Sequence, residues 1–265
     1  MNVLELILTA TAVLCLGFAA VYFVCRRIDN YGFVDVAWSY SFAALAALYA
    51  FNATGWSTRR ALIGTMVCLW SLRLGSHLLR RVAGHHPEED GRYKQLRQDW
   101  SANFHPRMFG FFQMQALSVV LLGLPFLLIV RNPDPALQPL EIAGLGLWLL
   151  ALLGEGLADT QLNAFKRDPA NRGKVCMRGL WNYSRHPNYF FEWLVWVAYA
   201  LFALGSDWGW LGILSPLCIL WLLLRVTGIP LTEEQSIRSK GDAYRAYQRT
   251  TSVFIPWFKR TSPHD

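Results

Sequence analysis

Charged residues are scarce in this sequence. Asp, Glu, Lys and Arg together make up only 16% of the 265 residues, whereas 54% are hydrophobic and 14% are aromatic. A typical soluble domain carries about 25% charged residues. The length would allow two small soluble domains, but this composition disfavours them and indicates a membrane protein.

The sequence also lacks the patterns that are typical of disulfides, metal sites and nucleic-acid binding. The five cysteines are an odd number, and we expect neither a disulfide nor a cysteine metal site. His85 and His86 are adjacent rather than four residues apart, and no acid is spaced to complete a zinc site, so we expect no metal. No basic stripe alternates with aromatic residues in a soluble segment, which disfavours a nucleic-acid partner.

Long apolar runs are what the sequence does contain. Each is close to the roughly 20 residues that cross about 30 Å of hydrocarbon. We count seven such runs, at 3–24, 34–53, 61–79, 109–130, 140–158, 188–205 and 208–229. Seven spans leave no room for a separate soluble domain. We therefore predict that residues 1–265 form a single all-α, polytopic membrane domain.

The basic residues predict the orientation of these spans, because short cytoplasmic loops are rich in Lys and Arg. No basic segment precedes the first run, and Arg26 and Arg27 follow it, so we expect a retained span with its N-terminus outside. The outside segments then hold only Arg59, Arg60 and Arg131. This predicts a cytoplasmic C-terminus in a multi-pass protein, of the cell inner membrane if the source is bacterial. The net charge of +7 mainly reflects this topology, with contact to anionic membrane lipids.

The stretch 179–196 combines a polar beginning with an apolar helix. Pro187 fits the first turn of that helix, because proline has a fixed φ and no N–H to lose. Asn188, Glu192 and Trp196 follow at i, i+4 and i+8 and share one helix face. A carboxylate at membrane depth costs at least about 2.5–3.5 kcal/mol, which favours a functional role for Glu192. Pairing of Glu192 with a neighbouring arginine is the structural alternative.

A second polar stripe extends the run at 140–158 toward the cytoplasm. Glu155, Asp159, Asn163 and Lys166 lie at i, i+4, i+8 and i+11. A segment dense in cations follows, directly before Arg185 and His186. Positive-inside charge alone would account for it, but so would a phosphorylated ligand held between these segments.

The polar residues within the apolar runs gather on one side of the predicted membrane. Those in the cytoplasmic half are Asp35, Arg73, Gln115, Glu155, Asp159, Asn188, Glu192 and Arg225. One site that opens to the cytoplasm would gather them in this way. A transporter or lipid-binding protein would also need a polar path through the outer half, which the sequence lacks. Asp35 alone could instead sit against a helix dipole, worth about 0.3–1 kcal/mol.

Several motifs together resemble one family. The segment GLWxYSRHPNY at 179–189 is followed by Glu192 and Trp196, then by GxxYxxY at 241–247 and by FIP at 254–256. This order resembles the C-terminal signature of the steroid 5-alpha-reductase family. With VDxxW at 34–38 and EDxRY at 89–93, the chain is most similar to the bacterial multi-pass branch.

The resemblance implies NADPH bound without a Rossmann fold, within a cofactor-binding half at 140–258. The chain indeed has no strand–GxGxxG–helix unit. Matching along the motif assigns the nicotinamide to Asn188, Glu192 and Trp196. It assigns the ribose and pyrophosphate to Asp159, Asn163, Tyr183 and Arg225. It assigns the phosphates to Lys166, Arg172, Lys174 and Arg178. The remaining cofactor-binding candidates are Arg185, His186, Tyr189 and Tyr247, although Tyr247 could instead anchor the chain at the membrane interface.

The implied reaction is hydride transfer to the β-carbon of a lipophilic enone such as a 3-oxo-4-ene steroid. Asp35 matches the family acid that hydrogen-bonds the ketone, and it must be protonated to donate. Val34 stands where the family has Gln. The family's tyrosine proton donor aligns near Trp70 or Ser71, so Tyr40 and Tyr93 are unranked replacements.

A methyltransferase is the alternative. Membrane enzymes such as isoprenylcysteine carboxyl methyltransferase share an Arg-His-Pro-x-Tyr segment and a later acidic pair similar to Glu233 and Glu234. Their S-adenosylmethionine cofactor has no phosphate, so the cations at 166–178 would have no ligand. In either case we expect a monomeric enzyme with a lipophilic substrate and an active site that faces the cytoplasm.

Overall fold

The computed structural model describes residues 1–226 and 228–259, and these residues form helices and no strand. The prediction of an all-α protein is confirmed. The α-helices are α1 (Val3–Ile28), α2 (Phe33–Asn52), α3 (Ser57–His85), α4 (Gly91–Asp99), α5 (Phe104–Leu122), α6 (Leu124–Arg131), α7 (Pro139–Arg167), α8 (Pro187–Ala203), α9 (Leu214–Trp221), α10 (Ile229–Lys240) and α11 (Asp242–Thr250). Short helical turns are η1 (Ser101–Asn103), η2 (Pro169–Asn171), η3 (Gly179–Asn182), η4 (Gly209–Ile213) and the π-helical η5 (Leu222–Val226).

Six helical segments of the described chain are long and apolar enough to cross a membrane. They are Val3–Ile28, Phe33–Asn52, Ser57–His85, Ser101–Arg131, Pro139–Arg167 and Gly209–Lys240. The seventh predicted run, at 188–205, is helical as α8, but α8 has only 17 residues. At about 1.5 Å per residue it is roughly 26 Å long, slightly less than the hydrocarbon thickness. Membrane spans are therefore supported, whereas seven crossings and their orientation stay predictions.

The chain divides into two compact units, which we describe separately. Unit 1 contains Met1–Gln138 and Ala203–Gly212, and unit 2 contains Pro139–Phe202 and Ile213–Asp265. The prediction of a single domain over 1–265 stays a prediction.

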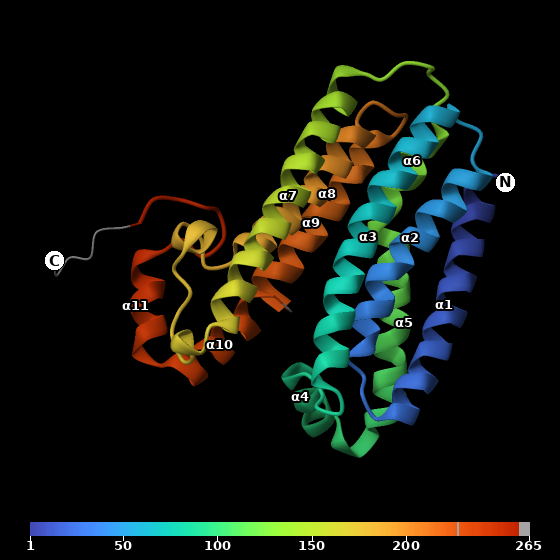
Figure 1. The fold of residues 1–265 in the computed structure, drawn as a ribbon. Helices are drawn as coiled ribbons and strands as arrows, with labels where there is room; N and C mark the ends of the chain where they lie inside the picture. Colours follow the sequence, from blue (N-terminus) through green and yellow to red (C-terminus); the bar gives the residue numbers. More distant parts are fainter. Residues whose placement is uncertain (227, 260–265) are drawn as a thin grey trace. The chain divides into compact units, whose positions relative to one another are not determined.

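Unit 1 is a bundle in which α2 packs against α3 and α1 packs against α5 (Figure 1). Aromatic rings fill its core: Tyr22 of α1, Tyr31 of the turn before α2 and Phe112 of α5 meet edge to face or tilted. Phe42 and Trp70 join α2 to α3, with ring centroids 5.3 Å apart. Outside the core, Leu16 and Phe51 are 73% and 86% exposed. Large exposed apolar side chains on long apolar helices are what lipid contact requires.

A fully buried arginine ties the beginning of α3 to the loop after α6. Arg59 has 0% exposure, and its guanidinium donates to the carbonyl oxygens of Asn132, Asp134 and Ala136 at 3.2, 2.5 and 2.6 Å. An arginine cannot deprotonate, so its burial requires acceptors of this kind. The loop supplies them from its backbone.

Unit 2 is built on the close approach of α7 and α8. A Cβ at Gly144 of α7 would lie 2.9 Å from the carbonyl oxygen of Ala198 and 3.0 Å from the backbone nitrogen of Phe202. Near this contact, the indole N–H of Trp148 donates to the hydroxyl of Tyr199 at 3.0 Å. Only glycine fits where two helix backbones approach this closely.

We predict that Gly144→Ala destabilises the protein by about 1–3 kcal/mol, because the added methyl group meets backbone atoms of α8 that cannot rotate away. Gly146→Ala is the matched control, since nothing lies within 4 Å of a Cβ at that position. On the same helix, the control substitution should leave stability unchanged or raise it slightly. Thermal unfolding of the detergent-purified proteins measures both. Equal melting temperatures for the two variants would contradict the close packing.

Candidate functional site

A carboxylate, a guanidinium and a phenol meet in unit 1. Asp35 lies in the first turn of α2, while Arg92 and Tyr93 lie in the first turn of α4. Arg92 Nη2 donates to Asp35 Oδ2 at 2.7 Å, and the Tyr93 hydroxyl donates to Asp35 Oδ1 at 2.8 Å. We call these three residues the Asp35 cluster. Asp90 begins α4 as its N-cap and accepts from the backbone N–H of Arg92, which places Arg92 and Tyr93 toward Asp35.

The electrostatics of the Asp35 cluster keep its phenol protonated. Tyr93 is 2% exposed. Burial, followed by the negative charge of Asp35, holds the pKa of Tyr93 well above its ordinary value. The cluster therefore presents a protonated phenol whose hydroxyl is oriented by a carboxylate, and Asp35 serves as the acceptor.

The structure distinguishes the two tyrosines that the sequence left unranked. The Tyr40 hydroxyl lies 3.1 Å from Ser76 Oγ of α3, and the ring packs against Gly75. Within the described residues, Tyr93 donates to Asp35 and Tyr40 does not. Geometry thus favours Tyr93 as the phenol of this cluster.

The predicted helix face on α8 is formed as expected. Its first turn begins at Pro187, as the sequence predicted. The indole N–H of Trp196 donates to Glu192 Oε1 at 2.9 Å, one turn apart. Asn188 Nδ2 donates to Asp159 Oδ1 of α7 at 3.3 Å, which joins the two predicted polar stripes. Within unit 2, an amide and two carboxylates therefore share one polar surface.

Arg185 and His186 meet an acid from α10 that the sequence did not assign. Arg185 Nε donates to Glu233 Oε1 at 2.6 Å, and His186 Nε2 lies 3.3 Å from the same oxygen. The second oxygen, Glu233 Oε2, accepts from Gln248 Nε2 at 2.9 Å. Burial lowers the pKa of His186 although the hydrogen bond to Glu233 opposes the shift, and burial thereby favours the neutral imidazole. Its ring stacks on that of Tyr189, with centroids 5.5 Å apart.

The guanidinium of Arg185 also binds the chain that follows α11. Its Nη1 donates to the carbonyl oxygens of Gln248 and Thr251 at 3.0 and 2.6 Å. The backbone N–H of Arg185 donates to the carbonyl of Ser252 at 2.8 Å. Arg185 is thus a tether in unit 2, and its role in cofactor binding stays a prediction.

Two predicted tyrosines fasten the same segment. The hydroxyl of Tyr247 donates to the carbonyl oxygens of Trp181 and Ser184, the second at 3.1 Å. The carbonyl of Tyr183 accepts from the backbone N–H of Trp257 at 2.9 Å. The Tyr247 contacts attach α11 to the signature at 179–186, and the Tyr183 contact attaches residues 251–258, which we call the C-terminal segment, to the same signature.

The predicted phosphate-binding residues lie at the surface of unit 2. Those that are exposed are Asn163, Lys166, Arg172, Lys174, Arg178 and Arg225. Arg178 lies over the ring of Phe165, with 5.9 Å between the guanidinium carbon and the ring centroid. Arg225 lies in the π-helical turn Leu222–Val226. An exposed set of cations is accessible to an anionic ligand.

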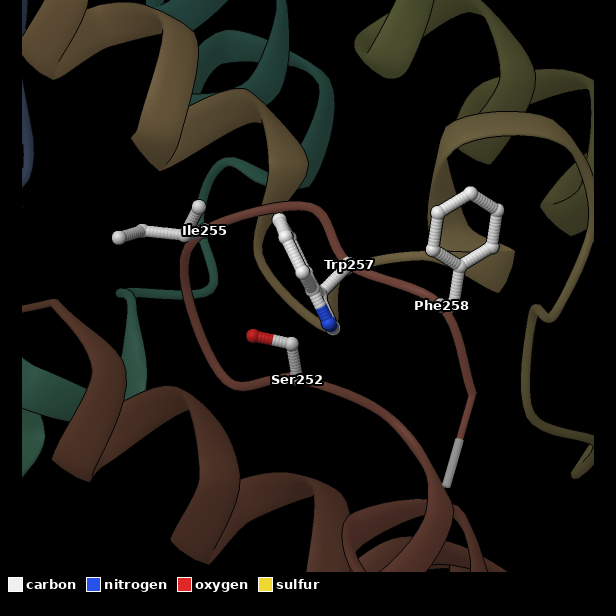
Figure 2. Close-up of a pocket in the computed structure, with 4 residues that line it drawn as sticks. All are labelled: Ser252, Ile255, Trp257 and Phe258. Atoms are coloured by element: carbon white, nitrogen blue, oxygen red, sulfur yellow. The ribbon is translucent and has the colours of Figure 1, made fainter. Parts of the chain in front are cut away.

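A pocket of about 290 Å³ opens in the C-terminal segment (Figure 2). Its lining consists of Ser252, Ile255, Trp257 and Phe258, and Trp257 and Phe258 are 67% and 75% exposed. None of the predicted site residues lines it. The pocket is therefore distinct from the predicted cofactor residues.

Comparison with known protein families identifies relatives of this chain. A family described as proteins of unknown function, DUF1295, matches residues 21–251. This chain belongs to the DUF1295 family. It is a family of membrane proteins distantly related to steroid reductases, so the resemblance is confirmed at that level, whereas the bacterial multi-pass branch stays a prediction.

An uncharacterized protein of Schizosaccharomyces pombe is 27% identical to this chain over 254 residues, and the match covers 84% of this chain and 72% of the relative. No solved structure matches the chain.

Two residues that complete these clusters were missed. Arg92 was noted only within the EDxRY motif, and Glu233 only as part of an acidic pair shared with methyltransferases. Glu233 lies 48 residues after Arg185. A buried arginine requires an acceptor, so the sequence could have suggested an acidic partner for Arg185. It contains several candidate acids, however, and does not select among them.

We predict that Arg185→Ala destabilises the protein by about 3 kcal/mol or more, because it leaves Glu233 without its nearest cation and frees the carbonyls of the C-terminal segment. Arg245→Ala is the control: its pair with Asp242 is exposed on both sides and should contribute at most about 1 kcal/mol. Thermal unfolding and limited proteolysis at 251–258 measure the difference. Proteolysis that is unchanged in Arg185→Ala would argue against the tether.

Proposed function

We propose that this chain is an NADPH-dependent membrane reductase of the carbon–carbon double bond of a lipophilic enone, such as a 3-oxo-4-ene steroid. In this proposal seven helices cross the membrane, with the N-terminus outside and the active site facing the cytoplasm. The observation that carries the proposal is the Asp35 cluster, in which the buried phenol of Tyr93 donates to Asp35 at 2.8 Å. Reduction of an enone requires a proton donor held in this way, whereas methyl transfer does not.

The residues of unit 2 fit NADPH in chemistry. The primary amide of nicotinamide offers both a donor and an acceptor, and the face formed by Asn188, Asp159 and Glu192 offers complementary groups. Trp196 orients the Glu192 carboxylate through its indole N–H. The exposed cations at 166–178 would hold the phosphates. Bound there, NADPH supplies the hydride.

The residues of the chain then stabilise the developing negative charge and transfer the proton. When hydride reaches the β-carbon, the electron pair of the double bond shifts and negative charge develops on the carbonyl oxygen. In our proposal the Tyr93 hydroxyl turns from Asp35 Oδ1 to that oxygen and gives it its proton, which yields an enol. Water then protonates the α-carbon while the enol oxygen returns its proton to Tyr93, so the product gains one hydride and one proton. Asp35 and Arg92 act as positioning residues for the phenol. The role that the resemblance gave to Asp35, donation to the ketone, passes to Tyr93, because Asp35 accepts from Tyr93 and Arg92.

An S-adenosylmethionine-dependent methyltransferase is the second candidate. One contact favours it: Arg185 and Glu233, which belong to the two segments shared with isoprenylcysteine carboxyl methyltransferases, lie 2.6 Å apart. The cations at 166–178 disfavour it, since S-adenosylmethionine offers them no phosphate.

The nucleotide that co-purifies with the protein tests the proposal directly. We expect mass spectrometry of the denatured, detergent-purified protein to find NADP or NADPH, and Glu192→Ala to lose it, because the nicotinamide amide loses its carboxylate partner. Glu234→Ala is the control, since Glu234 pairs with Arg238 at the surface. S-adenosylmethionine or its homocysteine product in place of NADP would overturn the reductase and support the methyltransferase.

The proton donor has a test of its own. We predict that Tyr93→Phe lowers kcat for enone reduction by about 10²–10⁴-fold while leaving NADPH binding intact, because only the donated proton is lost. Tyr40→Phe is the matched control, since its hydroxyl contacts Ser76 instead. Single-turnover oxidation of NADPH, followed by absorbance with an added 3-oxo-4-ene steroid, measures both variants. A larger loss in Tyr40→Phe than in Tyr93→Phe would assign the proton to Tyr40.

A further inference from the structure

The apolar side chains of the C-terminal segment divide between the inside and the outside of unit 2. Phe254 is buried against α8, with its ring centroid 5.7 Å from that of Phe190 and 5.8 Å from that of Trp193. The apolar residues that follow it are each more than half exposed and lie along the pocket in Figure 2: Ile255, Trp257 and Phe258. We call these three residues the apolar edge.

The contacts of Phe254 fix the level of the apolar edge along α8. Phe190 and Trp193 follow Pro187, the first residue of α8, by roughly 5 and 9 Å, at about 1.5 Å per residue. The helix is apolar from there on, and it packs closely along α7, which is long and apolar enough to cross a membrane. Headgroups meet acyl chains around the first turns of such a helix. The apolar edge lies at the level of those turns.

Hydrogen bonds hold the backbone of the apolar edge in place while its side chains stay exposed. The backbone N–H of Trp257 donates to the carbonyl of Tyr183 at 2.9 Å. The Ser184 hydroxyl donates to the carbonyl of Phe254 at 2.8 Å. Large apolar side chains that a fixed backbone leaves exposed are typical of an interaction surface.

The chemistry of this surface fits a phospholipid leaflet. The side chain of Trp257 combines a large apolar ring with an N–H that can donate to a lipid oxygen, which is why tryptophan favours membrane interfaces. Two exposed cations, Arg249 and Lys259, flank the segment, and anionic headgroups attract such residues. A protein partner would not require the apolar edge to lie at the level where α8 begins, whereas a leaflet does.

We infer that the C-terminal segment is a membrane-interface anchor, in which Ile255, Trp257 and Phe258 insert between the headgroups and acyl chains of the leaflet around the first turns of α8. Arg249 and Lys259 then face the phosphates of that leaflet. Such an anchor lies in the leaflet without crossing it, so it adds to the membrane-spanning helices. The inference does not depend on NADPH or on the proposed reaction.

The experiment places the full chain in lipid nanodiscs of phosphatidylcholine and phosphatidylglycerol, with a nitrobenzoxadiazole fluorophore attached to Phe258→Cys. Nitroxide groups on the acyl chains, close to the headgroups, quench the label from the lipid, and iodide quenches it from water. Ala246→Cys is the matched control, since Ala246 is exposed on α11. We expect the lipid nitroxide to quench the label at 258 about threefold more than the label at 246, and iodide to show the reverse order. The labelled wild type gives the background from the five native cysteines.

A second variant separates insertion from any effect of the label itself. Trp257→Glu, added to Phe258→Cys, should lower the lipid quenching about twofold, because a carboxylate at this depth is unfavourable. The fold should survive, since Trp257 is bound through its backbone and its side chain is exposed. Ala246→Glu, added to Phe258→Cys, should leave the lipid quenching unchanged.

Three results would overturn the anchor. Equal lipid quenching at 258 and 246 would show that both positions lie in water. Protection of position 258 from both quenchers would show that protein or another ligand covers the apolar edge. Lipid quenching that Trp257→Glu leaves unchanged would show that this side chain does not insert.

Discussion

The burial of Arg185 constrains the rest of unit 2. A guanidinium stays charged at any physiological pH, so the fold must surround it with acceptors. Glu233 supplies one from α10, and the carbonyls of Gln248 and Thr251 supply two more from the end of α11. One side chain thereby binds two parts of the chain that lie 48 to 66 residues after it. The signature at 179–189 consequently contains two kinds of residue: Arg185 maintains the architecture, while Asn188 lies on the polar face of α8 and contacts Asp159.

In unit 1, hydrogen bonds between charged groups likewise hold a short polar helix, α4, in place. By composition, α4 is a mixed-charge segment that would be expected to lie loosely in solvent. Two charged contacts instead attach it to other parts of unit 1: the bond from Arg92 to Asp35 and the bond from Arg97 to Asp29, each at 2.7 Å. Arg97 also lies over the rings of Tyr31 and Phe104, about 5 Å from each centroid. Tyr93 is therefore held on an anchored element.

Structural features that depend on residues close together in the sequence were predicted correctly from local rules. Pro187 predicted where α8 begins, and helical spacing predicted that Glu192 and Trp196 share a face, as their hydrogen bond confirms. Pairings across long separations were not predictable in this way. Nothing in the spacing selects Glu233 over other acids for Arg185, or Tyr93 over Tyr40 for Asp35, because those choices depend on how helices pack. The length of α8 was overestimated because the apolar run continues past the point where the helix ends at Ala203.

The burial of Arg59 affects which basic residues should be counted when the membrane orientation of this chain is predicted. A cation influences membrane topology through its attraction to anionic headgroups and to water at the interface. Arg59 reaches neither, since it is fully buried and donates to carbonyl oxygens of the loop after α6. It therefore belongs with the interior of the protein, and the number of basic residues available to the predicted outside segments falls from three to two. The predicted orientation thus corresponds to a larger charge asymmetry than a count along the sequence would give.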